Sequence, residues 1–269
     1  MTWSLIGTQF CLQLAFGVLA AMAFVPKAPV GVLFYRVMGT SALVPVLLAL
    51  GALVGLDGRA WSDPLVLACL APVVAYPLYS GPVRGARWGA ALAFALTGTV
   101  VAVVLVVGEG LTASALGGEA GGPVLSALAV ASALATGAVA GSVGLAMVLG
   151  HWYLTVPNLS VKHLTRLNRV TAVAMLLALA FLAVLCIGYG SGLVDDRGRE
   201  LFGSTGLLYL GTRITVGLVL PLVFAAMTAS SLRFQNTRSA TGILYASTVL
   251  VLIGTAVSVS LQDAFGIPL

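Results

Sequence analysis

The chain has 269 residues, of which 60% are hydrophobic and only 8% are charged, whereas soluble domains carry roughly 25% charged residues. A soluble fold could not cover its surface with so few polar side chains, so the composition predicts a protein whose solvent is lipid. The formal net charge of +5 is explained by charges in loops that orient membrane helices, and it does not indicate binding to nucleic acid.

Apolar runs long enough to cross a bilayer, which needs about 20 residues per helix, occur along the whole chain. We predict an all-α integral membrane protein: a single transmembrane domain over residues 1–269, built as a bundle of eight helices with short loops. The third run is the weakest, because Pro72 and Pro77 interrupt it. The first lacks a preceding basic region and is expected to be a retained span. The spans are expected at about 4–24, 31–55, 64–82, 88–107, 124–150, 170–190, 206–230 and 239–261.

Positive charges alternate between the loops. Each loop is named by the two spans that it joins. All eight acids and three of the cations lie on the side of the bundle opposite to loops 1–2, 3–4, 5–6 and 7–8. Because Lys and Arg are enriched in cytoplasmic loops, we expect these four loops to be cytoplasmic, both termini to be outside, and the protein to be integral to the cytoplasmic (inner or plasma) membrane. The cations assigned to these loops are Lys27, Arg36, Arg84, Arg87, Lys162, Arg166, Arg169, Arg233 and Arg238.

The stretch 150–169 is expected to be an interfacial loop between the fifth and sixth spans, broken by Pro157. It holds both histidines, His151 and His163. Two imidazoles on one loop cannot face each other across a bundle, so this spacing disfavours haem. The histidines are expected either to anchor an aromatic belt beside Trp152 or to donate a hydrogen bond to a quinone carbonyl.

Arg213 is the most informative single residue, because it lies about seven residues into a span, roughly 10 Å deep. A cation at that depth is costly unless it is paired or snorkels. The side-chain oxygens of Gln9 and Gln13, one turn apart in the first span, are its expected partners. Two interpretations stay open: Arg213 reaches outward to the acids near residue 195, or it binds an anionic or carbonyl-bearing ligand.

A second group of polar residues is expected on the cytoplasmic side. Arg36 enters the second span there, and the start of the last span carries Gln235, Arg238 and Ser239, with Ser239 suited to cap the helix. If a polar pocket exists on this side, these residues are expected to line it together with the two histidines. The alternative is that they are a cap and topological anchors.

Small residues in the fifth span favour close helix packing. Gly137 and Gly141 have the GxxxG spacing that lets two helix backbones approach in lipid. The face is expected either to pack inside the bundle or to dock another subunit. Cys11, Cys69 and Cys186 stand singly in apolar runs, so no metal site is predicted.

No pattern of catalytic residues occurs, so we assign no catalytic role and expect no enzymatic activity of the chain's own. The expected function is a membrane subunit or anchor of a larger complex, such as an electron-transfer complex, with a bound quinone or lipid. Expected partners are the bilayer and other membrane subunits. The alternative is a small-solute channel or facilitator that acts alone.

Overall fold

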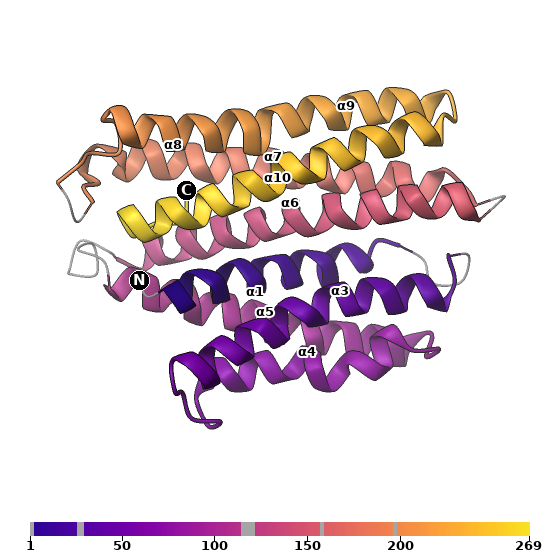
Figure 1. Cartoon of the computed structure of the whole chain (residues 1–269), viewed down its shortest axis with the longest axis horizontal. Helices are drawn as coiled ribbons and strands as arrows, with labels where there is room; N and C mark the ends of the chain where they lie inside the picture. The colour runs from indigo at the N-terminus through magenta and orange to yellow at the C-terminus, as the bar shows by residue number, and fades with distance from the viewer. Residues whose placement is uncertain (1–2, 26–29, 114–121, 157–158, 196–197) are drawn as a thin grey trace.

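A computed structural model describes residues 3–25, 30–113, 122–156, 159–195 and 198–269, and these residues form a helical bundle (Figure 1). Lys27, Glu119, Pro157, Asp196 and Arg197, which the sequence assigns to loops, lie outside this range. The helices are α1 (Trp3–Met22), α3 (Val32–Gly51), α4 (Pro64–Ser80), α5 (Ala86–Ala113), α6 (Pro123–Thr155), α7 (Lys162–Tyr189), α8 (Ser204–Ile214), α9 (Leu220–Arg233) and α10 (Thr237–Phe265).

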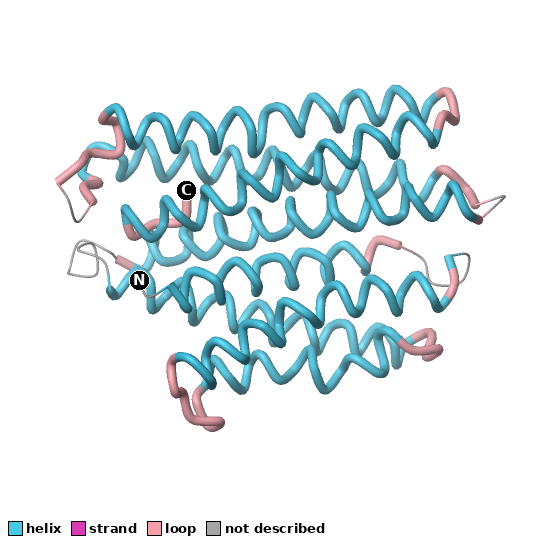
Figure 2. The backbone as a smooth tube through the Cα atoms, in the orientation of Figure 1, coloured by secondary structure: helices cyan, strands magenta, loops and turns pink. Residues whose placement is uncertain are grey.

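Three short irregular segments continue these helices. A π-helical segment, η1 (Ala52–Leu56), extends α3, and a second, η4 (Thr215–Val219), joins α8 to α9. A 3₁₀ turn, η3 (Gly190–Gly192), ends α7. Between the helices the described chain forms loops and one isolated β-bridge, without a strand (Figure 2).

Seven helical stretches are long and apolar enough to cross a membrane. They include the continuous stretches Val32–Leu56 and Ser204–Arg233, in which the π-helical segments lie. The predicted third span is shorter: α4 has 17 residues and contains Pro72 and Pro77. The expectation of an all-helical, multi-pass membrane bundle is therefore confirmed, while the eighth span stays a prediction.

The two ends of the bundle differ in charge. Figure 1 shows that α1 begins, and α10 ends, at the same end of the bundle, to which residues 57–63, 190–195 and 198–203 also belong. We call this the acidic end, because these connections carry Asp57, Asp63, Asp195 and Glu200. The 81–85 and 234–236 connections, the end of α6 and the start of α7 lie at the opposite end. We call it the cationic end, because it carries Arg84 and Lys162.

Many large apolar side chains lie on the outside of the bundle. Val74 of α4 is 69% exposed and Ile187 of α7 is 86% exposed. Hydrophobic patches of this kind are avoided on soluble monomers, whereas in a bilayer they contact lipid chains at little cost. The exposure pattern therefore agrees with the composition in favouring a lipid environment.

Glycine allows α1 and α6 to cross at backbone contact. A Cβ atom added to Gly17 would lie 1.8 Å from the carbonyl oxygen of Gly137, and one added to Gly141 would lie 1.9 Å from the carbonyl carbon of Gly17. The GxxxG face of α6 is thus used for packing inside the chain, as close-approach motifs in membranes are. This is the first of the two uses that the sequence left open.

The stretch 150–169 is not mainly a loop, which corrects the sequence-based expectation. Helix α6 continues to Thr155 and α7 already begins at Lys162. At 1.5 Å per residue, the 33 residues of α6 span about 50 Å, more than the roughly 30 Å of a hydrocarbon core. Charged and aromatic residues therefore continue the helices beyond the apolar layer, because long polar side chains are tolerated at that depth.

The start of α10 also differs from expectation. Its N-cap is Asn236, whose side-chain oxygen accepts a hydrogen bond from the main-chain N–H of Ser239 at 3.0 Å. Ser239 lies in the first turn and is not the cap. The helix begins two residues earlier than hydropathy indicates. Polar residues of the first turn do not count toward an apolar run, but they fit a capped helix end.

Ion pairs hold the connection between α3 and α4 at the acidic end. Arg59 donates to both carboxylate oxygens of Glu109 on α5, at 2.8 and 2.6 Å, and to Asp63 at 3.3 Å. Asp63 also caps α4 by accepting from the N–H of Leu65. The hydrogen bonds to Glu109 raise the pKa of the Arg59 guanidinium, and the bidentate geometry is the strong form of this interaction.

Candidate functional site

Arg213, at the end of α8, points into the bundle and is 1% exposed. Its guanidinium donates to the hydroxyl oxygen of Thr136 on α6 at 2.7 Å and to the main-chain oxygen of Leu269 at 3.3 Å. The side-chain hydroxyl of Ser258 on α10 donates to the same Leu269 oxygen. Arg213 thus ties α8, α6, α10 and the residues that follow α10 into one buried polar layer.

Gln9 and Gln13 are fully buried in α1. The expectation that they accept hydrogen bonds from Arg213 is wrong, because neither does. Gln9 donates to the side-chain oxygen of Gln262 on α10. Both polar atoms of the Gln13 side chain have no hydrogen-bond partner within the described protein. The partners of Arg213 come from α6 and the end of the chain, whereas Gln9 bonds to α10.

Unpaired polar atoms cluster in this layer and its surroundings. Besides Gln13, they include the Thr8 hydroxyl, the Gln9 side-chain oxygen and the Gln262 amide nitrogen. Each buried polar atom without a partner costs about 1–3 kcal/mol, and native proteins keep few of them. The layer is therefore a costly feature, and in a membrane protein costly polar groups inside the bundle mark candidate functional positions.

The backbone beside Arg213 is irregular. The π-helical segment η4 begins two residues after it, and its Gly217 packs directly on Gly254 of α10. A Cβ atom added to Gly254 would lie 2.2 Å from the Gly217 Cα atom. π-Helical turns widen a helix locally and are frequent at functional sites. The two glycines let α10 approach η4 beside the guanidinium, since a Cβ atom added to Gly217 would lie 3.4 Å from an Arg213 guanidinium nitrogen.

The expectation that Arg213 reaches outward is wrong. Asp195, the first of the acids to which it could extend, is bonded within its own turn: Arg199 donates to it from the main chain at 2.8 Å and from its side chain at 2.7 and 2.6 Å. An arginine that lies inside the bundle needs hydrogen-bond acceptors, and the Thr136 hydroxyl and the Leu269 main-chain oxygen supply them.

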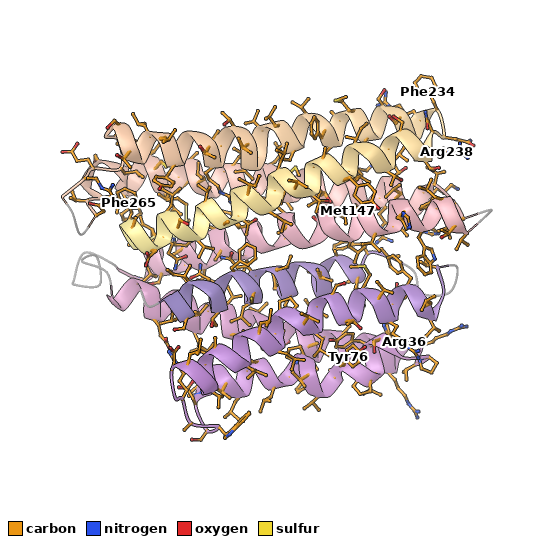
Figure 3. The ribbon with its side chains drawn as sticks, in the orientation of Figure 1. Arg36, Tyr76, Met147, Phe234, Arg238 and Phe265 are labelled. Carbon is orange, nitrogen blue, oxygen red and sulfur yellow. The ribbon has the colours of Figure 1, made fainter. Side chains whose placement is uncertain are left out.

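A groove between α1 and α3 contains Arg36. It has a volume of about 670 Å³. Arg36, Thr40 and Ser41 form its polar part, and the hydroxyls of Thr40 and Ser41 donate to carbonyl oxygens one turn earlier in α3. Figure 3 shows Arg36 on α3, toward the cationic end. The apolar part of the groove is lined by side chains that include Phe10, Leu14, Leu33, Val37, Val44 and Leu48.

The wall of the groove is fastened to α4 and to an aromatic cluster. The Thr40 hydroxyl lies 2.9 Å from the hydroxyl of Tyr76, whose ring packs edge-to-face on Tyr79. On the buried side of α3, the rings of Tyr35 and Trp88 are 5.6 Å apart. These contacts hold α3 in position, so that the face carrying Arg36 is part of a firm scaffold.

The two histidines lie on different helices. His151 is exposed on α6, and its Nδ1 atom is 3.3 Å from the hydroxyl of Tyr245 on α10. His163 is half-buried in the first turn of α7. Neither lines the Arg36 groove or the other cavities described here. Arg36 and Gln235 line two different cavities, so no described cavity gathers the inner polar residues as expected.

Gln235 lines a cavity of about 340 Å³ at the cationic end, between the start of α7 and the end of α9. Arg238 lies nearby at the start of α10 (Figure 3) but does not line it. The cavity brings in four cations that the sequence placed in loops without assigning them to a site: Lys162, Arg166, Arg169 and Arg233. Lys162, Arg166 and Arg169 are four and three residues apart along α7, and this spacing could have identified a shared face of that helix.

Sequence reasoning missed three residues of the buried layer: Thr136, Ser258 and Gln262. A single hydroxyl or amide inside an apolar run is a weak signal, because such groups often bond to their own helix. A scan against models of protein families gives no match for this chain, and a search among curated proteins finds no similar sequence. The geometry of these sites is therefore the basis for a functional proposal.

Proposed function

We infer that the chain is a multi-pass membrane subunit that binds a quinone or a comparable lipid in the groove between α1 and α3, within a larger complex such as an electron-transfer complex. The observation that carries the proposal is Arg36 in a groove of about 670 Å³ whose other lining is mostly apolar. In this proposal the protein is integral to the cytoplasmic membrane and its cationic end faces the cytoplasm, following the positive-inside rule.

Arg36 has the chemistry that such a ligand needs. Its side chain is exposed, and no described residue forms an ion pair with it. A guanidinium has five N–H donors and no acceptor, so it suits the carbonyl oxygens of a quinone or the phosphoryl oxygens of a lipid. The apolar part of the groove suits an isoprenoid or acyl chain, and binding sites commonly combine a few polar groups with an apolar wall.

The proposal is tested with the purified chain in phosphatidylcholine nanodiscs and a quinone that carries a photoreactive azide. Crosslinks are expected on α1 and α3, and Arg36→Gln is expected to reduce them at least about fivefold. Arg84→Gln is the matched control, because Arg84 is also an exposed cation of the same end but lines none of the described cavities. Equal labelling of wild type and Arg36→Gln would contradict quinone binding in this groove.

The membership of a complex is tested separately by gentle purification from native membranes. Co-purifying redox subunits would support an electron-transfer role, and a lipid retained by wild type but not by Arg36→Gln would identify the ligand as a lipid. A chain that purifies alone and retains neither would contradict the subunit proposal.

A channel or facilitator is the second candidate, and one observation favours it. A cavity of about 400 Å³ opens between α1, α8 and α10 at the acidic end. Its lining includes Ile6 and Tyr209, which lie about one helical turn from Gln9 and Arg213 of the buried polar layer. Solute flux through liposomes containing only this chain, lost in Arg213→Met, would support this candidate over the first.

A further inference from the structure

We propose that the cavity between the start of α7 and the end of α9 is a phosphate-binding site, which is independent of the quinone or lipid groove. It is lined by Lys162, Thr165, Arg166, Arg169, Arg233 and Gln235. Four of these are cations, and the lining contains no Asp or Glu. A cavity of about 340 Å³ has room for a phosphate group and part of the molecule that bears it.

The cations of α7 share one face of the helix. Lys162 and Arg166 are four residues apart and Arg166 and Arg169 are three apart, the spacings at which helical side chains are neighbours. Like charges at such spacings repel, and a cation in the first turn also opposes the helix dipole. A bound anion relieves both the repulsion and the unfavourable interaction with the helix dipole. Topological anchors that were scattered over the surface would have no such repulsion to relieve.

One lining residue, Arg166, is held in place, and so are the two helices that carry most of the lining. The Arg166 guanidinium stacks over the ring of Phe24, 5.7 Å from its centroid, as in a cation–π contact. The buried Asn168 side chain donates to the carbonyl oxygen of Ala225 at 2.9 Å and fastens α7 to α9. The cations therefore converge from two helices whose separation is fixed by a buried hydrogen bond.

Gln235 adds an unusual backbone feature. Its φ of 55° makes it the one non-glycine residue with positive φ in the described chain. It follows the end of α9, where glycine is the common residue. A glutamine at this position causes backbone strain, but it also lines the cavity with its amide side chain. Strained residues of this kind are frequent at binding sites.

The site is suited to a phosphate monoester or diester. Arginine forms bidentate, charge-assisted hydrogen bonds to phosphate oxygens, and Lys162 supplies a point charge. Because the cavity lies at the end of the bundle, where α7 begins and α9 ends (Figure 1), the phosphate could belong to an anionic lipid headgroup or to a free phosphate compound. Both share the chemistry of the site, and the test separates them.

The test uses the full chain in dodecyl maltoside at low ionic strength, titrated with dioctanoyl phosphatidylglycerol or with inorganic phosphate, with binding followed by native mass spectrometry and thermal shift. Arg166→Gln with Arg233→Gln is expected to weaken binding at least about tenfold, since charge-assisted hydrogen bonds contribute most of such an affinity. The control, Arg84→Gln with Arg87→Gln, neutralises two cations of the same end and is expected to stay within about twofold of wild type.

The two probes identify the source of the phosphate. Binding of phosphatidylglycerol but not of inorganic phosphate assigns the site to a lipid headgroup, and comparable binding of both assigns it to a free phosphate compound. Arg166→Lys with Arg233→Lys keeps the charges and is expected to keep more affinity than the glutamine pair. No binding by wild type, or equal losses in the test and control pairs, would overturn the proposal.

Discussion

The acidic and cationic ends of the bundle handle their charges differently. At the acidic end, Arg59 is held by Glu109 and Asp63, and Arg199 is held by Asp195. At the cationic end, the described lysine and arginine side chains form no ion pair, and four of them converge on one cavity. Pairing fixes the loops at the first end, whereas charge at the second remains available to an anion. Similar residue types therefore have a structural use at one end and a binding use at the other.

Arg213 is expected to give the largest effect, because it is the buried counterpart of the exposed cations. Arg213→Ala removes the donor shared by Thr136 and Leu269 and leaves a cavity in the polar layer. We expect a loss of about 3 kcal/mol in unfolding free energy, measured by denaturation in mixed micelles. Arg84→Ala should change it by less than about 0.5 kcal/mol. Similar losses of unfolding free energy in Arg213→Ala and Arg84→Ala would mean that Arg213 contributes no more to stability than an exposed cation.

Glu109→Gln tests the pairing at the acidic end. The variant leaves Arg59 with a neutral partner in place of a bidentate carboxylate. We expect a loss of about 1 kcal/mol in unfolding free energy, which is below the usual range for a charged hydrogen bond because both side chains are partly exposed. The difference between wild type and variant should shrink in 1 M salt, which screens partly exposed charges. A difference that is unchanged by salt would assign the loss to packing.

Gln235→Gly tests the strain at the cationic end. Glycine adopts a positive φ without the penalty that a Cβ atom brings, so the variant should be more stable than wild type by about 1 kcal/mol. It should also bind phosphate more weakly, because the amide is lost. A variant that gains stability and keeps wild-type affinity would show that Gln235 takes no part in binding.

Arg169→Gln is expected to give the smallest effect and completes the comparison. In phosphate-free buffer it removes repulsion of Arg166, three residues away, and should raise stability by about 0.3 kcal/mol. In saturating phosphatidylglycerol the sign should reverse, because a cation that contacts the anion is lost. Measurement of both stabilities by thermal unfolding checks the reversal, and an unchanged sign would place Arg169 outside the phosphate site.

The sequence predicted features that depend on neighbouring residues better than features that depend on contacts between distant parts of the chain. Five of the eight expected spans lie within helical stretches and the other three pass a helix end by one or two residues, because hydropathy over about 20 residues is a local property. Their ends were less accurate at α7, which begins at Lys162 and not near residue 170, because polar residues continue a helix outside the apolar layer. The short, proline-containing α4 was correctly singled out as the weakest run.

The candidate sites depended on contacts that no local pattern encodes. Arg213 was recognised from its depth in an apolar run, but its partner Thr136 is 77 residues away, and Gln9 meets Gln262 across 253 residues. Which faces meet is decided by helix rotation and crossing, and these follow from the close packing of Gly17 on Gly137 and of Gly217 on Gly254. Composition and hydropathy determined that the chain forms a membrane bundle of apolar helices, because burying backbone polar groups in lipid leaves helices as the solution. Only the tertiary structure decided which polar groups converge, because backbone contacts between distant helices set the direction of every side chain between them.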